Sequence, residues 1–390
     1  MKLTKLMLSA FAAIVALAAC NKVETDVPEN ASLKSVKLSF DNVIMTKGLA
    51  GDKINAGDPV VVNDFKIILT DDSFSQEYGA MKDATGKEEA VFYFTGSTLS
   101  SDPYEFHYVD HKVTKVIAIA NMGDVTLETL KNSFTGTIAG QQDQTNLILS
   151  AYATLVSTGE THGDVTSGKY TEVYSATVAL KPVISRFEVD GFVVNFSTPD
   201  PKFNKIEVTD IAFDHYYPNI KFTTTGGEFK AVADGSHIKN PSSYDNDAEV
   251  FSWLNNTSTT GWYIDRFATD EVVMIPDNAA TAEVFENRAD TPKPLAYHFF
   301  AGNLVPTMVI RVLADGNPAY VYTSDFRSKS NNQVLTSIEP GMIYRMSAKG
   351  EVDQTGGSVP IPDDFDPIKR CLNITVQVEP WVVDLVTPEF

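Results

Sequence analysis

The run "YSATVALKPVISRFEVDGFVVNF" (174–196) decides the fold class of the chain. Apolar and polar side chains alternate on both sides of Pro182, and β-branched and aromatic residues are frequent. Alternation at period two is typical of half-buried strands, and proline is disfavoured in the middle of a sheet. The run therefore predicts two strands with a break near Pro182.

Similar short runs recur along the chain, for example "FKIILT" (65–70) and "TMVIRVLA" (307–314), with Gly, Asp, Asn and Pro between them. Only 124–134 and 143–155 have a spacing that suggests helix. At 390 residues the chain is long enough for two hydrophobic cores. We therefore predict an all-β protein with little helix. It forms two β-sandwich domains, at 48–182 and 183–352.

The first residues have the pattern of an export signal. Two lysines precede the apolar run "LMLSAFAAIVALAA" (6–19), and Cys20 follows it. The run is short for a membrane span and ends in small residues, as a signal peptide does. The ending "LAAC" resembles a bacterial lipobox, so we predict a lipoprotein signal peptide at 1–20 and a lipid on Cys20. The alternative is an ordinary signal in which this cysteine has no role.

A strand and a protease-accessible segment follow. In "SVKLSF" (35–40), the apolar residues Val36, Leu38 and Phe40 alternate with polar ones. The next segment, "MTKGLAGDKINAGDP" (45–59), is rich in Gly and Asp and contains Lys47 and Lys53. Its composition predicts a loop, which a protease that cuts after lysine can reach.

The chain ends in "CLNITVQVEPWVVDLVTPEF" (371–390), a second strand pattern. Its apolar face carries Ile374, Val376 and Val378, with Trp381 beyond them, and it must be buried in its own domain or in another molecule. Pro380 interrupts the backbone ladder, so two short pairing segments are expected rather than one strand. The preceding residues 353–370 are rich in Gly, Pro and Asp, which predicts a linker.

Charge and motifs exclude several classes of function. The formal net charge of −20 argues against nucleic-acid binding, which needs a basic face. No phosphate-binding glycine loop, metal-spaced Cys/His cluster or nucleophile elbow occurs in the sequence, so we expect no enzyme activity, cofactor or metal.

The stretch "YDNDAE" (244–249) favours a solvated loop, with a calcium site as the alternative. Trp253, Trp262 and Tyr263 could stack on a sugar, which leaves a glycan-binding surface lipoprotein as the alternative function.

Several of these motifs, taken in order, resemble the fimbrillins of Bacteroidales, the FimA-like and Mfa-like pilins. They are the lipobox at Cys20, the strand and lysine that follow it, "FFAGNLVPTMVIRV" (299–312), "GMIYRM" (341–346) and the linker before "LNITVQVEPWVV" (372–383). The resemblance is scattered over most of the chain and is most specific at its two ends.

The resemblance implies a lipoprotein precursor of two tandem transthyretin-like β-sandwich domains, exported to the outer membrane and cell surface. A trypsin-like protease would remove a propeptide, residues 21–47, with the strand at Val36, Leu38 and Phe40. The C-terminal segment 371–390, anchored by Ile374, Val376, Val378 and Trp381, would then complete the next subunit of an adhesive fimbria. The implied partners are copies of the chain, the protease and minor fimbrial subunits. No Arg precedes Arg186, so the implied cut lies between Lys47 and Gly48, with Lys53 as the second choice.

Overall fold

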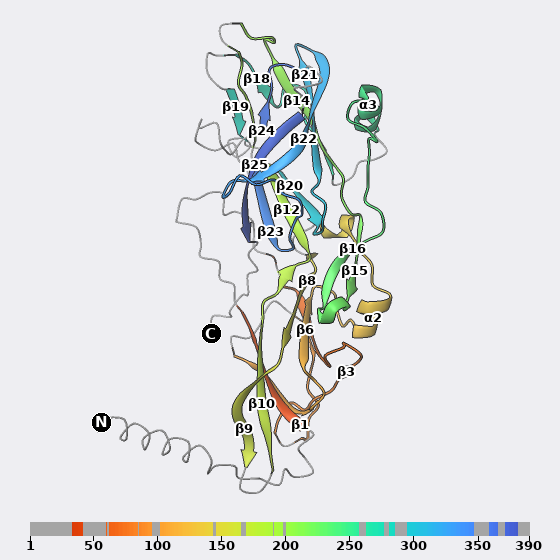
Figure 1. Cartoon of the computed structure of the whole chain (residues 1–390), viewed down its shortest axis with the longest axis vertical. Helices are drawn as coiled ribbons and strands as arrows, with labels where there is room; N and C mark the ends of the chain where they lie inside the picture. Colours follow the sequence, from red (N-terminus) through yellow and green to blue (C-terminus); the bar gives the residue numbers. More distant parts are fainter. Residues whose placement is uncertain are drawn as a thin grey trace, which may run out of the picture.

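A computed structural model gives the structure of the chain. It describes residues 33–41, 60, 62–84, 86–95, 102–142, 146–164, 169–189, 191–197, 200–256, 263–276, 281–284, 295–346, 359–365 and 371–380. These residues form an elongated molecule of two halves, one above the other in Figure 1, and almost every element is a strand. The predicted all-β class is confirmed.

The first half is a sandwich of two sheets. One sheet has the order β5-β1-β10-β9, and the other has the order β11-β8-β6-β2-β3, with β4 paired to β2. The strands are β1 (Leu33–Phe40), β2 (Asp64–Thr70), β3 (Glu77–Tyr78), β4 (Tyr93–Thr95), β5 (Tyr104–Asp110), β6 (Lys115–Ala120), β7 (Gly136–Thr137), β8 (Leu149–Thr154), β9 (Val156–Asp164), β10 (Lys169–Val178) and β11 (Lys181–Pro182).

The second half contains a nine-stranded sheet of order β17-β14-β21-β22-β25-β23-β12-β20, with β18 paired to β14. A three-stranded sheet, β19-β13-β24, accompanies it. The strands are β12 (Ile184–Val189), β13 (Gly191–Val194), β14 (Ile206–Asp214), β15 (Asn219–Thr223), β16 (Lys230–Asp234), β17 (Ile264–Arg266), β18 (Val273–Met274), β19 (Thr281–Val284), β20 (Leu295–Phe300), β21 (Thr307–Ala314), β22 (Asn317–Ser328), β23 (Met342–Met346), β24 (Val359–Ile361) and β25 (Cys371–Pro380).

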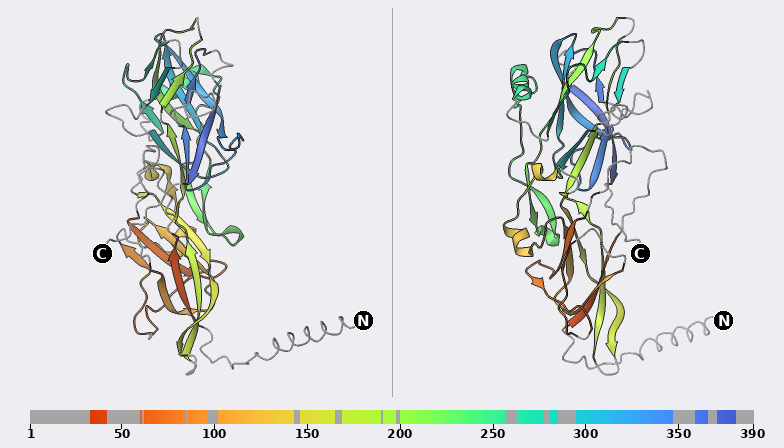
Figure 2. Two further views of the ribbon diagram at one scale, coloured as in Figure 1. Left: turned by 90° about the vertical axis from the view of Figure 1, so that its left-hand side faces the viewer. Right: turned by 180° about the vertical axis from the view of Figure 1, so that it is seen from behind.

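The chain passes from one half to the other next to Pro182. Lys181 and Pro182 still pair with β8, whereas Ile184 starts β12 in the nine-stranded sheet. The hairpin β15–β16 reaches back, because Asn219 and Ile220 pair with β7 of the first half. Figure 2 shows this hairpin beside the junction in both views. The two halves are therefore joined by backbone hydrogen bonds as well as by the chain itself.

Helices are few in the described part of the chain. The predicted helix at 124–134 is present as α2 (Leu127–Asn132), whose N-cap Thr126 accepts a hydrogen bond from the Thr129 amide. The helical expectation for 143–155 is wrong at β8, which pairs with β6 along its whole length. A second helix, α3 (Asp247–Asn255), was not expected. Two 3-10 turns complete the set, η2 (Ile138–Gln141) and η5 (Thr225–Gly227).

The segment predicted as a linker, 353–370, is only partly described, and its described part is not a free arm. Val359 and Ile361 are buried in β24, which runs parallel to β13 at the edge of its sheet. The carboxylate of Asp363 also accepts a 2.7 Å hydrogen bond from the Ser197 amide. The expectation is corrected at 359–365, where two apolar residues two positions apart outweigh the Pro-rich composition, since an edge strand tolerates proline.

Candidate assembly strands

The first described strand, β1, lies inside its sheet rather than at the edge. It runs parallel to β10 and antiparallel to β5, with Val36 opposite Tyr174 on one side and Phe106 on the other. Both backbone edges of β1 are therefore paired. Removing β1 would leave the inner edges of β5 and β10 without partners, and unpaired strand edges bind other strands readily.

The face of β1 that points into the sandwich is apolar. Val36 and Leu38 are fully buried. Phe40 is half-buried, and its ring centroid lies 5.5 Å from that of Phe65 and 5.7 Å from that of Tyr104. Burying a Val or Leu side chain contributes roughly 1.5–3 kcal/mol, so these residues hold β1 firmly in place. Their predicted burial is confirmed, while the predicted removal of the strand stays a prediction.

Lys34 places a charged ammonium group on the inner face of β1, next to the apolar residues. Its side chain is buried, and its ammonium donates to the carbonyl oxygens of Val113 and His111, the latter at 3.3 Å. The ammonium also lies 4.3 Å from the centroid of the Tyr174 ring. Desolvation lowers the pKa of Lys34, although the charges of Asp110 and Glu172 oppose the shift. The first residue of the inner face of β1 is therefore a buried cation, and burying its ammonium costs desolvation energy.

The opposite face of β1 is polar. The Ser35 hydroxyl lies 3.1 Å from Nδ1 of His107 and 2.6 Å from the Thr171 hydroxyl. The Lys37 ammonium lies 3.6 Å from the Glu105 carboxylate and 3.8 Å from that of Glu160. These last three side chains are more than a third exposed, so each ion pair contributes little to stability.

The terminal strand β25 is placed in the sheet of its own half. It runs parallel to β22 and antiparallel to β23, so both of its edges are paired. Ile374 and Val376 are buried and Val378 is half-buried, which confirms the predicted apolar face. The expectation that the whole segment 371–390 serves another molecule meets a physical obstacle at 371–380. Leaving this position would expose these residues and unpair two strands.

Charged side chains fix the end of β25. Glu188 of β12 is buried and accepts hydrogen bonds from Nε of Arg186, at 2.6 Å, and from Nε of Arg345, at 2.8 Å. Arg345 also reaches Glu379 of β25, at 3.4 Å. Nη1 of Arg186 lies 3.4 Å from Nε2 of His298, whose Nδ1 lies 2.7 Å from the Gln141 carbonyl oxygen. This charged cluster joins β12, β20, β23 and β25 to η2 of the first half.

Other predicted sites fall outside the described residues. They are the lipidation site Cys20, the cleavage residues Lys47 and Gly48, and the anchor Trp381. Cys371 is described and carries an exposed free thiol at the start of β25.

The stretch 244–249 is the beginning of a helix rather than a calcium loop. The side chain of Asn246 caps α3, and Glu249 accepts hydrogen bonds from the amide and hydroxyl of Ser242. Within the described part of the chain, no group of three or more His, Cys, Asp or Glu side chains is arranged to hold a metal ion.

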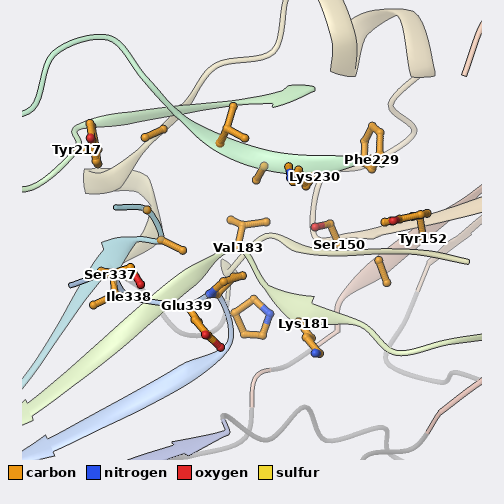
Figure 3. Close-up of a pocket in the computed structure, with 18 of the residues that line it drawn as sticks. Ser150, Tyr152, Lys181, Val183, Tyr217, Phe229, Lys230, Ser337, Ile338 and Glu339 are labelled. Carbon is orange, nitrogen blue, oxygen red and sulfur yellow. The ribbon is translucent and has the colours of Figure 1, made fainter. Parts of the chain in front are cut away.

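A cleft with a volume of about 930 Å³ lies at the junction of the halves. Figure 3 shows Lys181 and Tyr152 from the first half, Phe229 and Lys230 from the hairpin, and Glu339 from the second half around it. Trp253 is not among its lining residues, and Trp262 lies outside the described residues. The described residues therefore give no pair of tryptophans for a sugar platform.

No described helix has the length and apolar content needed to cross a bilayer.

Neither a protein-family model nor a curated protein sequence matches the chain. Solved structures do match it. A "putative cell adhesion protein" of Parabacteroides distasonis matches with a TM-score of 0.52 at 11% identity, over 90% of this chain and 98% of that one. The fold is shared over nearly the whole chain. The fimbrilin FimA of Porphyromonas gingivalis matches with a TM-score of 0.45 at 13% identity, over 91% and 99% of the two chains. At 11% identity the match to the Parabacteroides protein establishes the fold alone, a multi-domain arrangement of β-sheets.

Proposed function

We propose that the chain is a structural subunit of a cell-surface fimbria, made as a lipoprotein precursor and polymerised by strand exchange. The position of β1 carries this proposal. β1 is an inner strand with a buried face, yet it is the first strand of the described chain, and a lysine-containing segment follows it. One cut after Lys47 would leave β1 held by non-covalent contacts alone. Another strand could then take its place.

The proposed donor is the second segment of the tail, 381–390, rather than the whole of 371–390. Because β25 is paired on both edges, we assign Ile374, Val376 and Val378 to holding the tail in its own subunit. Trp381 keeps its predicted role as a donor anchor. The segment starts immediately after Pro380, where the backbone ladder of β25 must end, and it contains further apolar residues.

Exchange of this kind joins a surface at one end of a subunit to a different surface of the next. Such a contact does not close on itself, so it propagates into a filament. The proposed partners are other copies of the chain, a processing protease and minor fimbrial subunits. Before processing, the lipid on Cys20 would hold the precursor at the outer membrane. The fold match to the "putative cell adhesion protein" of Parabacteroides distasonis supports this role, and we expect no catalysis.

The test uses the lipid-free full chain, which is cut with a limiting amount of trypsin and examined by gel without boiling and by electron microscopy. We expect filaments after a cut at Lys47. A chain that ends after Pro380 should fold and be cut but form no filament. A chain that ends after Lys369 should lose β25 and fail to fold stably. Filaments from the chain ending at Pro380, or none from the cut full chain, would refute the proposal.

A further inference from the structure

The position left by β1 offers four inward side-chain sites, occupied in the structure by Lys34, Val36, Leu38 and Phe40. The site of Lys34 is unlike the other three. It presents two carbonyl oxygens, from His111 and Val113, beside the Tyr174 ring. A side chain here must donate a hydrogen bond and cover an aromatic ring. Lys34 does both, but at the cost of desolvating a charge.

A tryptophan meets the same requirements without a charge. Its indole N–H is a donor, and its ring provides a large apolar surface that packs against other aromatic rings. Trp381 is the only tryptophan in the proposed donor segment 381–390. A donor strand with Trp381 at the Lys34 site would therefore keep the carbonyl hydrogen bond and avoid burying an ammonium.

Side-chain alternation restricts the register of the tail. If the even-numbered residues point inward, Asp384 enters the apolar core. If the odd-numbered residues point inward, the inner face reads Trp381, Val383, Leu385, Thr387. A shift of this face by two residues places either Glu379 at the Lys34 site or Glu389 at the Phe40 site. Only the unshifted register keeps every carboxylate off the inner face.

We propose that Trp381–Thr387 of a second copy replaces Lys34–Phe40, with Trp381 against Tyr174 and the Val113 carbonyl. Val383 then takes the place of Val36, Leu385 that of Leu38, and Thr387 that of Phe40. This assignment rests on the proposed function and adds the register and the recognition site. Pro380 and Pro388 would stand at the two ends of the replaced segment, in the places of Leu33 and Asp41. Pro388 would forgo the hydrogen bond that the Asp41 amide donates to the Val178 carbonyl oxygen at 2.8 Å.

The register has an electrostatic consequence on the outer face. Lys37 pairs in register with Glu105 and lies close to Glu160. Asp384 would take the position of Lys37 and bring a third carboxylate to this point. Like charges at exposed positions repel weakly and are screened by salt. Filaments should therefore form at lower protein concentration when salt is raised or when Asp384 is changed to Asn.

The register can be measured by disulfide trapping in the cut full chain, with Cys20 and Cys371 changed to Ser. Asp384→Cys combined with Glu105→Cys should give covalent ladders under mild oxidation, because these positions face each other. Val382→Cys or Val386→Cys combined with Glu105→Cys serves as the matched control, two residues out of register. Ladders in a control pair but not in the 384/105 pair would overturn the register.

A second measurement avoids cysteines. Thr387→Phe should restore a ring next to Phe65 and Tyr104 and lower the protein concentration needed for filaments about tenfold. Val386→Phe, which adds the same ring on the outer face, should not. Equal effects of the two changes would also overturn the register. If the unmodified cut chain forms no filament, the proposed function fails as well, whereas filaments with another trapping pattern refute the register alone.

Discussion

The carboxylate of Glu379 lies 3.4 Å from the guanidinium of Arg345. This contact holds the C-terminal end of β25 against β23, with which it pairs. Arg345 is almost fully buried and shares Glu188 with Arg186. One buried carboxylate for two guanidinium groups leaves a positive charge, which Glu379 compensates. The end of β25 is therefore held by charge as well as by its apolar face.

We expect Glu379→Gln to destabilise the fold by about 1–3 kcal/mol, because the buried Arg345 loses its second carboxylate. Urea unfolding measures this change. Hydrogen exchange should also quicken at the amides of β25. Glu228→Gln is the control, since Glu228 pairs with Lys230 on the exposed surface and this substitution should leave stability nearly unchanged. Similar stabilities for the two variants would contradict the role assigned to Glu379.

His298 predicts a loss of stability in acid. Burial and, secondarily, Arg186 lower the pKa of His298 to about 3, so the imidazole is neutral in the folded chain. Its partners fit one neutral tautomer, in which Nδ1 donates to the Gln141 carbonyl and Nε2 accepts from Arg186. The unfolded chain takes up this proton near pH 6.5, so stability is lost as the pH falls from about 6.5 towards 3.

The expected loss from His298 is up to about 1.4 kcal/mol for each pH unit in this window. His298→Asn keeps a donor for the Gln141 carbonyl but does not titrate. Urea unfolding at several pH values between 7 and 4 should therefore show a shallower decline for this variant. Parallel declines in the variant and the parent would show that other groups govern the acid response.

Leu38→Ala should destabilise the intact chain by about 2–5 kcal/mol, because Leu38 is fully buried on the inner face of β1. After the cut at Lys47, the β1 fragment of this variant should also leave the folded body faster, as measured by size-exclusion chromatography over time. Val91→Ala removes an exposed side chain and should change neither quantity. Equal release rates for the two variants would show that the inner face does not retain β1.

The sequence predicts the elements of this fold better than their pairing. β21 could be read from alternation, because every second residue from Met308 to Ala314 is buried while Thr307, Arg311 and Leu313 are only half-buried. β12 is buried at all six positions, including its polar ones, which alternation does not predict. The partners of β25 could not be read, because β22 and β23 are chosen by burial and by charge pairs such as Arg345–Glu379, formed between residues distant in sequence. Periodicity reveals that Ile374 must be buried but not in which sheet.

Two local errors have physical explanations. At β8, the spacing of apolar residues fits a helix as well as a strand, and pairing with the buried strand β6 decides for the strand. At α3, the signal was present in the sequence, because Asn246 followed three residues later by Glu249 is the pattern of a helix N-terminus. The oxygen atoms that suggested calcium serve instead to cap the helix and to bind Ser242.

The position of the cut is the last prediction. Lys47→Ala should prevent trypsin from releasing the β1 fragment at this bond, and filament formation should fall with it. Lys53→Ala, six residues further along a segment of similar composition, is the matched control and should leave both unchanged. The masses of the released fragments identify the bond. If Lys53→Ala blocks release and Lys47→Ala does not, the second-choice lysine is the processing site. If the double change Lys47→Ala and Lys53→Ala also leaves release and filament formation unchanged, β1 is not freed through these lysines, and the basis for strand exchange is lost.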